Sequence, residues 1–71
     1  MIISIVGTKY NDNNIINLNH LIHAKAGITV KSDGLKTCLW LEMTGNKIIQ
    51  IHFNTEEECY KALEFILDVS H

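Results

Sequence analysis

Apolar and polar side chains alternate along residues 20–31 more regularly than elsewhere in the chain. From position 22 onward the even positions are all apolar, whereas the odd positions are mostly polar. Alternation with a period of two is typical of a β-strand that buries one face. The pattern therefore predicts a strand. Its core-facing residues are Ile22, Ala24, Ala26, Ile28 and Val30, and its outward-facing residues include His23, Lys25, Thr29 and Lys31.

Three other segments have the short, β-branched or aromatic character of strands, with turn-forming residues between them. We expect strands at residues 2–6, 37–44 and 47–53, with turns at Ser32-Asp33-Gly34 and Gly45-Asn46. Residues 7–19 are rich in Asn and Asp, which predicts a loop that contains one turn of helix near residues 15–18.

The alternation also indicates how the last two strands pair. A strict two-residue loop would pair Met43 with Ile48 and place Glu42 beside an apolar neighbour. A shifted register instead gathers six apolar side chains on one face, and register is strongly specified wherever one face is buried. The predicted pairs are Leu39 with Phe53, Leu41 with Ile51 and Met43 with Ile49, joined by a three-residue loop or a bulge near Gly45. The opposite face then carries Cys38, Trp40, Glu42, Ile48, Gln50 and His52.

Residues 55–69 have the period of an amphipathic helix. Thr55 as N-cap and Glu58 three positions later form a capping box, and three acids suit the positive end of the helix dipole. Cys59, Ala62, Leu63, Ile66 and Val69 form the core face, and Tyr60, Phe65 and Leu67 widen it. The apolar arc is roughly 220°, more than one sheet needs to cover. We therefore expect a homo-oligomer, most simply a dimer, with Tyr60, Phe65 and Leu67 at its interface.

Together these elements predict one domain over residues 1–71, of the α+β class. The expected architecture has two layers, a four-stranded antiparallel β-meander with one C-terminal helix packed on one face. A chain of 71 residues is too short for a second core, and a lone core of this size is marginal. Oligomerisation is one of the usual ways in which so small a domain gains stability.

Composition and charge narrow the functional classes. The chain is 46% apolar and 20% charged, which is typical of a folded protein rather than a disordered one. Its six basic residues are all Lys, its net charge is −2, and the Lys are not clustered. This balance argues against binding to duplex DNA or an anionic membrane. The short apolar start predicts a strand rather than a leader or membrane span, so we expect a cytoplasmic protein. The abundance of Ile, Asn and Lys suggests an AT-rich genome, such as that of a low-GC bacterium or a phage.

The cysteines and histidines do not form a recognisable site for a metal or for catalysis. His20 and His23 lie three residues apart, a spacing that puts two ligands together on a helix but on opposite faces of a strand. Two Cys are too few for a disulfide framework, so free thiols are expected, with a Cys38–Cys59 disulfide as the alternative. Cys38 and His52 could meet on the outer face, yet no third group would orient them. We expect no metal, no cofactor and no enzymatic activity.

The outer face of the predicted sheet is the strongest candidate for function, because it carries the only Trp of the chain. Its predicted members are His23, Lys25, Lys31, Trp40, Glu42, Gln50 and His52. Trp is enriched where proteins bind one another. We therefore expect a small non-enzymatic interaction protein, a regulator, adaptor or inhibitor of a larger protein. Two alternatives remain: a face that stacks a nucleotide or other small ligand, and a Trp that only packs beneath Lys stems.

Overall fold

The computed structural model describes residues 1–31 and 34–70, with side chains described except at 28–31 and 34–36. The described residues form five strands, one short 3-10 helix and one α-helix. These are β1 (Ile2–Gly7), β2 (Asp12–Asn17), η1 (Leu18–His20), β3 (Leu21–Lys31), β4 (Gly34–Met43), β5 (Lys47–Phe53) and α1 (Glu56–Val69). The α+β class is confirmed. The four-stranded meander is wrong, because β1 and β2 form their own sheet and only β3, β4 and β5 form the meander.

Strand β2 lies where the sequence predicted a loop. It pairs antiparallel with β1, from Ile2 opposite Asn17 to Gly7 opposite Asp12. Asn and Asp are depleted in strands because their side chains compete for backbone hydrogen bonds. Here the Asn14 amide donates across the hairpin to the Ile5 carbonyl and, within β2, to Asp12, and the Ser4 hydroxyl donates across the hairpin to Asn13. The expected turn of helix lies slightly later, at η1.

Between β4 and β5, the predicted faces are confirmed but the predicted pairs are wrong by two residues. Leu39 lies opposite Ile51, Leu41 opposite Ile49 and Met43 opposite Lys47. A shift of two residues keeps every side chain on its face, since the side-chain period of a strand is two. Residues 44–46 form a three-residue loop in which Gly45 and Asn46 have positive φ angles of 79° and 60°. A three-residue loop was one of the two predicted connections.

The start of β3 departs from regular alternation. The pairing with β4 is regular from His23 onward but shifts between Leu21 and His23, which marks a β-bulge. Because of this shift Leu21 packs against the core, whereas Ile22 is 61% exposed. The prediction that Ile22 faces the core is therefore wrong. Ala24 and Ala26, after the bulge, pack against the core as predicted.

The helix agrees with its prediction in position and capping. The Thr55 hydroxyl accepts from the backbone N–H of Glu58 at 3.2 Å and donates to the Glu58 carboxylate at 3.1 Å. Cys59 and Ile66 are fully buried, and Ala62 and Leu63 pack against the core beside them.

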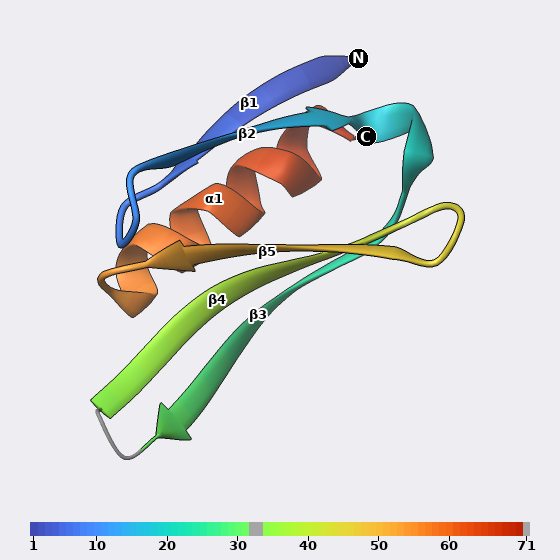
Figure 1. The fold of residues 1–71 in the computed structure, drawn as a ribbon. Coiled ribbons are helices and arrows are strands. Elements are labelled where there is room, and N and C mark those ends of the chain that lie inside the picture. Colours follow the sequence, from blue (N-terminus) through green and yellow to red (C-terminus); the bar gives the residue numbers. More distant parts are fainter. Residues whose placement is uncertain (32–33, 71) are drawn as a thin grey trace.

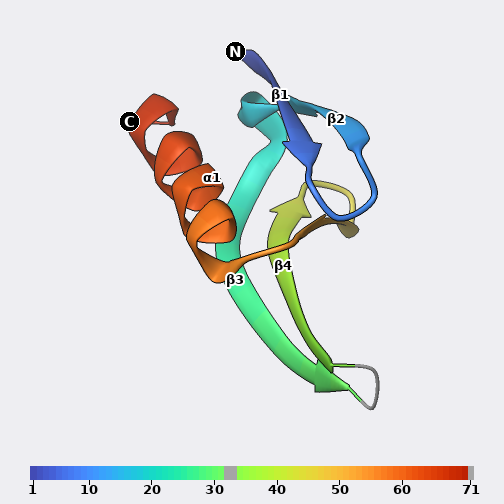
Figure 2. The same cartoon turned by 90° about the vertical axis from the view of Figure 1, so that its left-hand side faces the viewer.

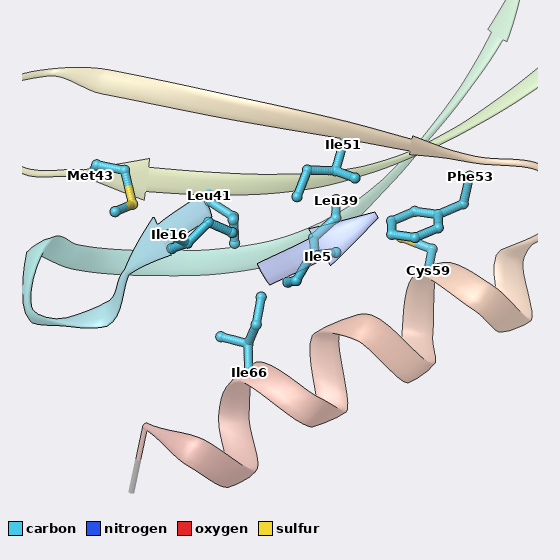
Figure 3. Close-up of a cluster of buried hydrophobic side chains, with 9 residues drawn as sticks. All are labelled: Ile5, Ile16, Leu39, Leu41, Met43, Ile51, Phe53, Cys59 and Ile66. Carbon is cyan, nitrogen blue, oxygen red and sulfur yellow. The ribbon is translucent and has the colours of Figure 1, made fainter. Parts of the chain in front are cut away.

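One hydrophobic core joins the two sheets and the helix. The β1–β2 hairpin, α1 and the three-stranded sheet surround it from three directions (Figures 1 and 2). Its buried members come from every one of these elements, as the close-up in Figure 3 shows. They are Ile5, Ile16, Leu39, Leu41, Met43, Ile51, Phe53, Cys59 and Ile66.

The two edges of the three-stranded sheet differ. At β5, the turn after β1 closes the end of the edge, where the Lys9 N–H donates to the His52 carbonyl and the Asn54 N–H donates to the Thr8 hydroxyl. The close approach depends on Gly7, where an added Cβ would lie 2.9 Å from the His52 carbonyl oxygen. At β3, the described chain supplies no strand on the side away from β4.

Candidate binding surface

The outward surface of the three-stranded sheet consists of three rows of residues that lie opposite one another across the strands. The rows are His23–Glu42–Ile48, Lys25–Trp40–Gln50 and Gly27–Cys38–His52. Directly opposite residues in an antiparallel sheet point to the same side. We call this surface, with His23, Lys25, Trp40, Glu42, Ile48, Gln50 and His52, the Trp40 face. It contains every predicted member of the binding surface except Lys31, whose side chain lies outside the described ones.

Trp40 is held in place by its two neighbours on β3. An added Cβ at Gly27 would lie 3.4 Å from Cδ1 of Trp40, so the indole ring covers the position that has no side chain. On the other side, Nζ of Lys25 lies 5.5 Å from the centre of the Trp40 ring, a cation–π distance. The ring is half-buried. Trp40 is thus a fixed, partly exposed aromatic platform between Gly27 and the ammonium group of Lys25.

Tyr10 adds a second aromatic ring to this surface. It comes from the turn between β1 and β2 and meets the His52 ring edge-on, with ring centres 5.3 Å apart. Nζ of Lys9 lies 5.9 Å from the centre of the Tyr10 ring. Sequence patterns could not reveal this contact, because it depends on how the hairpin packs against β5, more than forty positions away in the chain.

The exposed Ile22 lies next to the Trp40 face and adds to the apolar surface of Ile48 at the end near the β4–β5 loop. With Glu42, Met43 and Asn46 they line an open groove of about 240 Å³. Beside it, His23, Lys25, Trp40 and Glu42 enclose a hollow of only about 50 Å³. Pockets for drug-sized ligands usually measure about 300–1,000 Å³. The hollow has room for one or two water molecules but not for a nucleotide base.

His20 and His23 lie on different elements rather than on opposite faces of one strand as predicted, because β3 begins only at Leu21. His20 belongs to η1, where its Nδ1 lies 3.2 Å from the Thr44 hydroxyl and its carbonyl accepts from the Thr44 N–H. His23 belongs to the Trp40 face. Within the described residues, no three His, Cys, Asp or Glu side chains come close enough together to hold a metal ion.

The two cysteines are free thiols and both are buried. The interpretation of Cys38 as an exposed partner of His52 is wrong, because its side chain is only 6% exposed although the two residues are opposite each other. Burial raises the pKa of the Cys38 thiol and of the Cys59 thiol. A raised pKa keeps a thiol protonated at neutral pH, the opposite of what a cysteine nucleophile needs.

The predicted oligomer residues on α1 are exposed but lie on two flanks. Tyr60 and Leu67 are seven positions apart and therefore share one side of the helix. Phe65 is two positions from Leu67, which places it about 160° away around the helix axis. Leu67 contributes to a groove of about 390 Å³ between α1 and β3, whose other main members are Leu18, Leu21, Ile22 and Ala24.

Comparison of the chain with protein-family models, with curated proteins and with solved structures found no match. Among the described residues, none of the helical segments combines the length and the apolar character that crossing a bilayer requires.

Proposed function

We propose that this protein is a non-enzymatic, protein-binding homo-oligomer that presents the Trp40 face to a larger protein and regulates or inhibits it. The observation that carries the proposal is Trp40 itself, a half-buried aromatic fixed between Lys25 and Gly27 at the centre of an outward sheet face. Binding energy at protein interfaces is concentrated in such pre-positioned aromatic anchors, because they lose little conformational freedom on binding.

The surroundings of Trp40 support a protein partner. Exposed apolar side chains, Ile22 and Ile48 on one side and Tyr10 on the other, flank it. Charged and polar groups, Lys25, Glu42 and Gln50, lie between them. Aromatic residues are enriched at protein–protein interfaces, and taken as a whole a non-obligate interface mixes apolar with polar groups much as this surface does. Since both thiols are free, we also propose a reducing compartment, the cytosol.

Capture of the partner tests this function. The immobilised full chain is exposed to extract from cells that produce it naturally, and two matched charge reversals are compared with it. Glu42→Lys lies on the Trp40 face, whereas Glu57→Lys lies on the exposed side of α1. There it loses a surface ion pair to Lys61 and one favourable charge at the start of the helix, each a small effect on stability. We expect the chain and Glu57→Lys to retain the same protein, and Glu42→Lys to bind it at least tenfold more weakly. Equal retention by both variants would refute the proposed surface.

Small-ligand binding is the second candidate, supported by the basic and aromatic groups around Trp40. The 50 Å³ hollow argues against it, so a nucleotide would have to stack on the open face. Titration of Trp40 fluorescence with mononucleotides and short RNA distinguishes the two candidates. Saturable quenching at micromolar concentration that Lys25→Glu abolishes would favour this second function, and unchanged fluorescence would exclude it.

A further inference from the structure

Of the two edge strands of the described three-stranded sheet, β3 is the longer, with eleven residues against seven in β5. In the described chain, β3 pairs along one side only, with β4, over its eleven-residue length. An uncovered edge presents a row of free N–H and C=O groups to which another strand can pair. By contrast, the Lys9 and Thr8 contacts close the end of the β5 edge. Lys25 does not block the β3 edge, because its ammonium group lies over the Trp40 ring.

Apolar surface of α1 runs beside this edge. Tyr60, Leu63 and Leu67 follow one another at helical spacings of three and four, which aligns them along one flank. Leu67 is 45% exposed and shares the 390 Å³ groove with Leu21 and Ile22 of β3. Unpaired backbone N–H and C=O groups of β3 and exposed apolar side chains of α1 therefore lie on the same side of the molecule.

We propose that a second copy of this chain covers this side, with β3 pairing antiparallel to β3 of the second copy about a two-fold axis. The two three-stranded sheets then form one six-stranded sheet, and the Tyr60–Leu67 flank of each helix packs against the other. The inference rests on the homo-oligomer of the proposed function and adds its surface and symmetry. We infer a second copy as the partner because two identical strand edges can pair antiparallel about a two-fold axis. Such pairing uses the same surface on both chains and so forms a closed symmetric dimer.

The dimensions of the molecule agree with this interface. A dimer interface of standard size takes about 800 Å² from each partner, roughly a sixth of the 4739 Å² surface of the chain. Such an area must occupy most of one long side of a molecule that measures 36 × 23 × 19 Å. At about 3.3 Å per residue, β3 alone is about 36 Å long. By comparison, the other exposed apolar face, on the β1–β2 hairpin with Ile2, Val6 and Ile15, is shorter. Its strands have six residues each and are only about 20 Å long.

The oligomeric state of matched variants tests the inference. Leu67→Glu and Phe65→Glu introduce the same charge at equally exposed positions, 45% and 46%, on opposite flanks of α1. Ile15→Glu places it on the exposed face of the hairpin. Sedimentation velocity across micromolar concentrations should show a dimer for the unmodified chain, Phe65→Glu and Ile15→Glu. Leu67→Glu should be monomeric, with a dissociation constant at least tenfold larger, and circular dichroism checks that it is folded.

Hydrogen exchange of the unmodified chain gives a second readout that does not depend on any variant folding. Dilution below the dissociation constant should remove protection from alternate amides of β3 and leave those of β1 and β2 unchanged. A chain that is monomeric at all concentrations would overturn both the homo-oligomer and this inference. Three outcomes would overturn the inference but not the homo-oligomer. They are a dimer that persists in Leu67→Glu, a dimer that is lost in Phe65→Glu or Ile15→Glu, and a dimer whose β3 amides are unprotected.

Discussion

Raising the pH above about 9 should destabilise this protein through its two buried thiols. Cys38 is 6% exposed and Cys59 is fully buried, and burial raises the pKa of each thiol above the ordinary value of 9.0. In the unfolded chain both thiols are in water and lose their protons near that ordinary value. Above it the folded chain binds more protons than the unfolded chain, so the free energy of unfolding falls as the pH rises.

The size of the effect follows from the same linkage. If the native thiol keeps its proton throughout, deprotonation stabilises the unfolded state relative to the folded state by about 1.4 kcal/mol per thiol between pH 8 and pH 10. Two thiols together lower the free energy of unfolding by at most about 3 kcal/mol over this range. A core of this size supplies only about 3–5 kcal/mol in total. The loss should therefore be large enough to measure without ambiguity.

Urea unfolding followed by Trp40 fluorescence at pH 8, 9 and 10 measures this dependence. Cys38→Ala and Cys59→Ala should each reduce the fall in unfolding free energy by about half, whatever they do to the value at pH 8. All other ionisable groups are the same in the three proteins, so their contribution cancels in the comparison. Equal slopes in the three proteins would refute the reasoning. So would alkylation of native Cys38 at pH 7 as fast as in urea, which is the behaviour expected of a Cys38–His52 catalytic pair.

Three further substitutions test the described fold by chemical denaturation. Thr55→Ala should cost about 1 kcal/mol of unfolding free energy because it removes the helix cap, while Ser70→Ala at the other end of the helix should cost much less. Ile16→Ala should lower the free energy of unfolding by about 2–5 kcal/mol, because Ile16 is fully buried. The adjacent Ile15 is 67% exposed, so Ile15→Ala should lower it by less than about 1 kcal/mol. Equal costs would mean that β2 does not pack as described. Gly7→Ala should cost about 1–3 kcal/mol, because its Cβ would lie 2.5 Å from Asp12 Oδ1 and 2.9 Å from the His52 carbonyl oxygen; an unchanged midpoint would contradict the close approach of the hairpin to β5.

The helix was predictable because everything that specifies it is local in sequence. Its cap, its acidic first turn and its apolar period lie within residues 55–69, and the structure places the helix there. The strand β2 was not predictable in this way. Its Asn-rich sequence disfavours a strand unless β1 pairs with it and the Ile5 carbonyl accepts a hydrogen bond from the Asn14 amide. This pairing depends on tertiary structure, which the local sequence does not specify.

The faces of the sheet were predictable, but the details that shape the candidate surface were not. Alternation identifies which residues share a side, so the six described members of the predicted surface lie together. Alternation cannot reveal a bulge. Ile22 is the extra residue between Leu21 and His23, so its side chain points outward, although the apolar pattern of the sequence continues through it unchanged. Nor can alternation show that the packed hairpin brings Tyr10 to His52, or that Cys38 is buried on a face expected to be open.

The exposed Ile22 connects the two proposed surfaces. It lines the groove beside β3 and α1 together with Leu67, and it also lines the groove at the end of the Trp40 face together with Ile48. Pairing of β3 about a two-fold axis perpendicular to the sheet would place both Trp40 faces on the same side of one continuous sheet. A partner that contacts both faces would then bind the dimer more tightly than the monomer, and by linkage it would strengthen the dimer by the same factor. Leu67→Glu should therefore weaken partner binding although it lies outside the Trp40 face, whereas Glu42→Lys should weaken partner binding and leave the dimer intact.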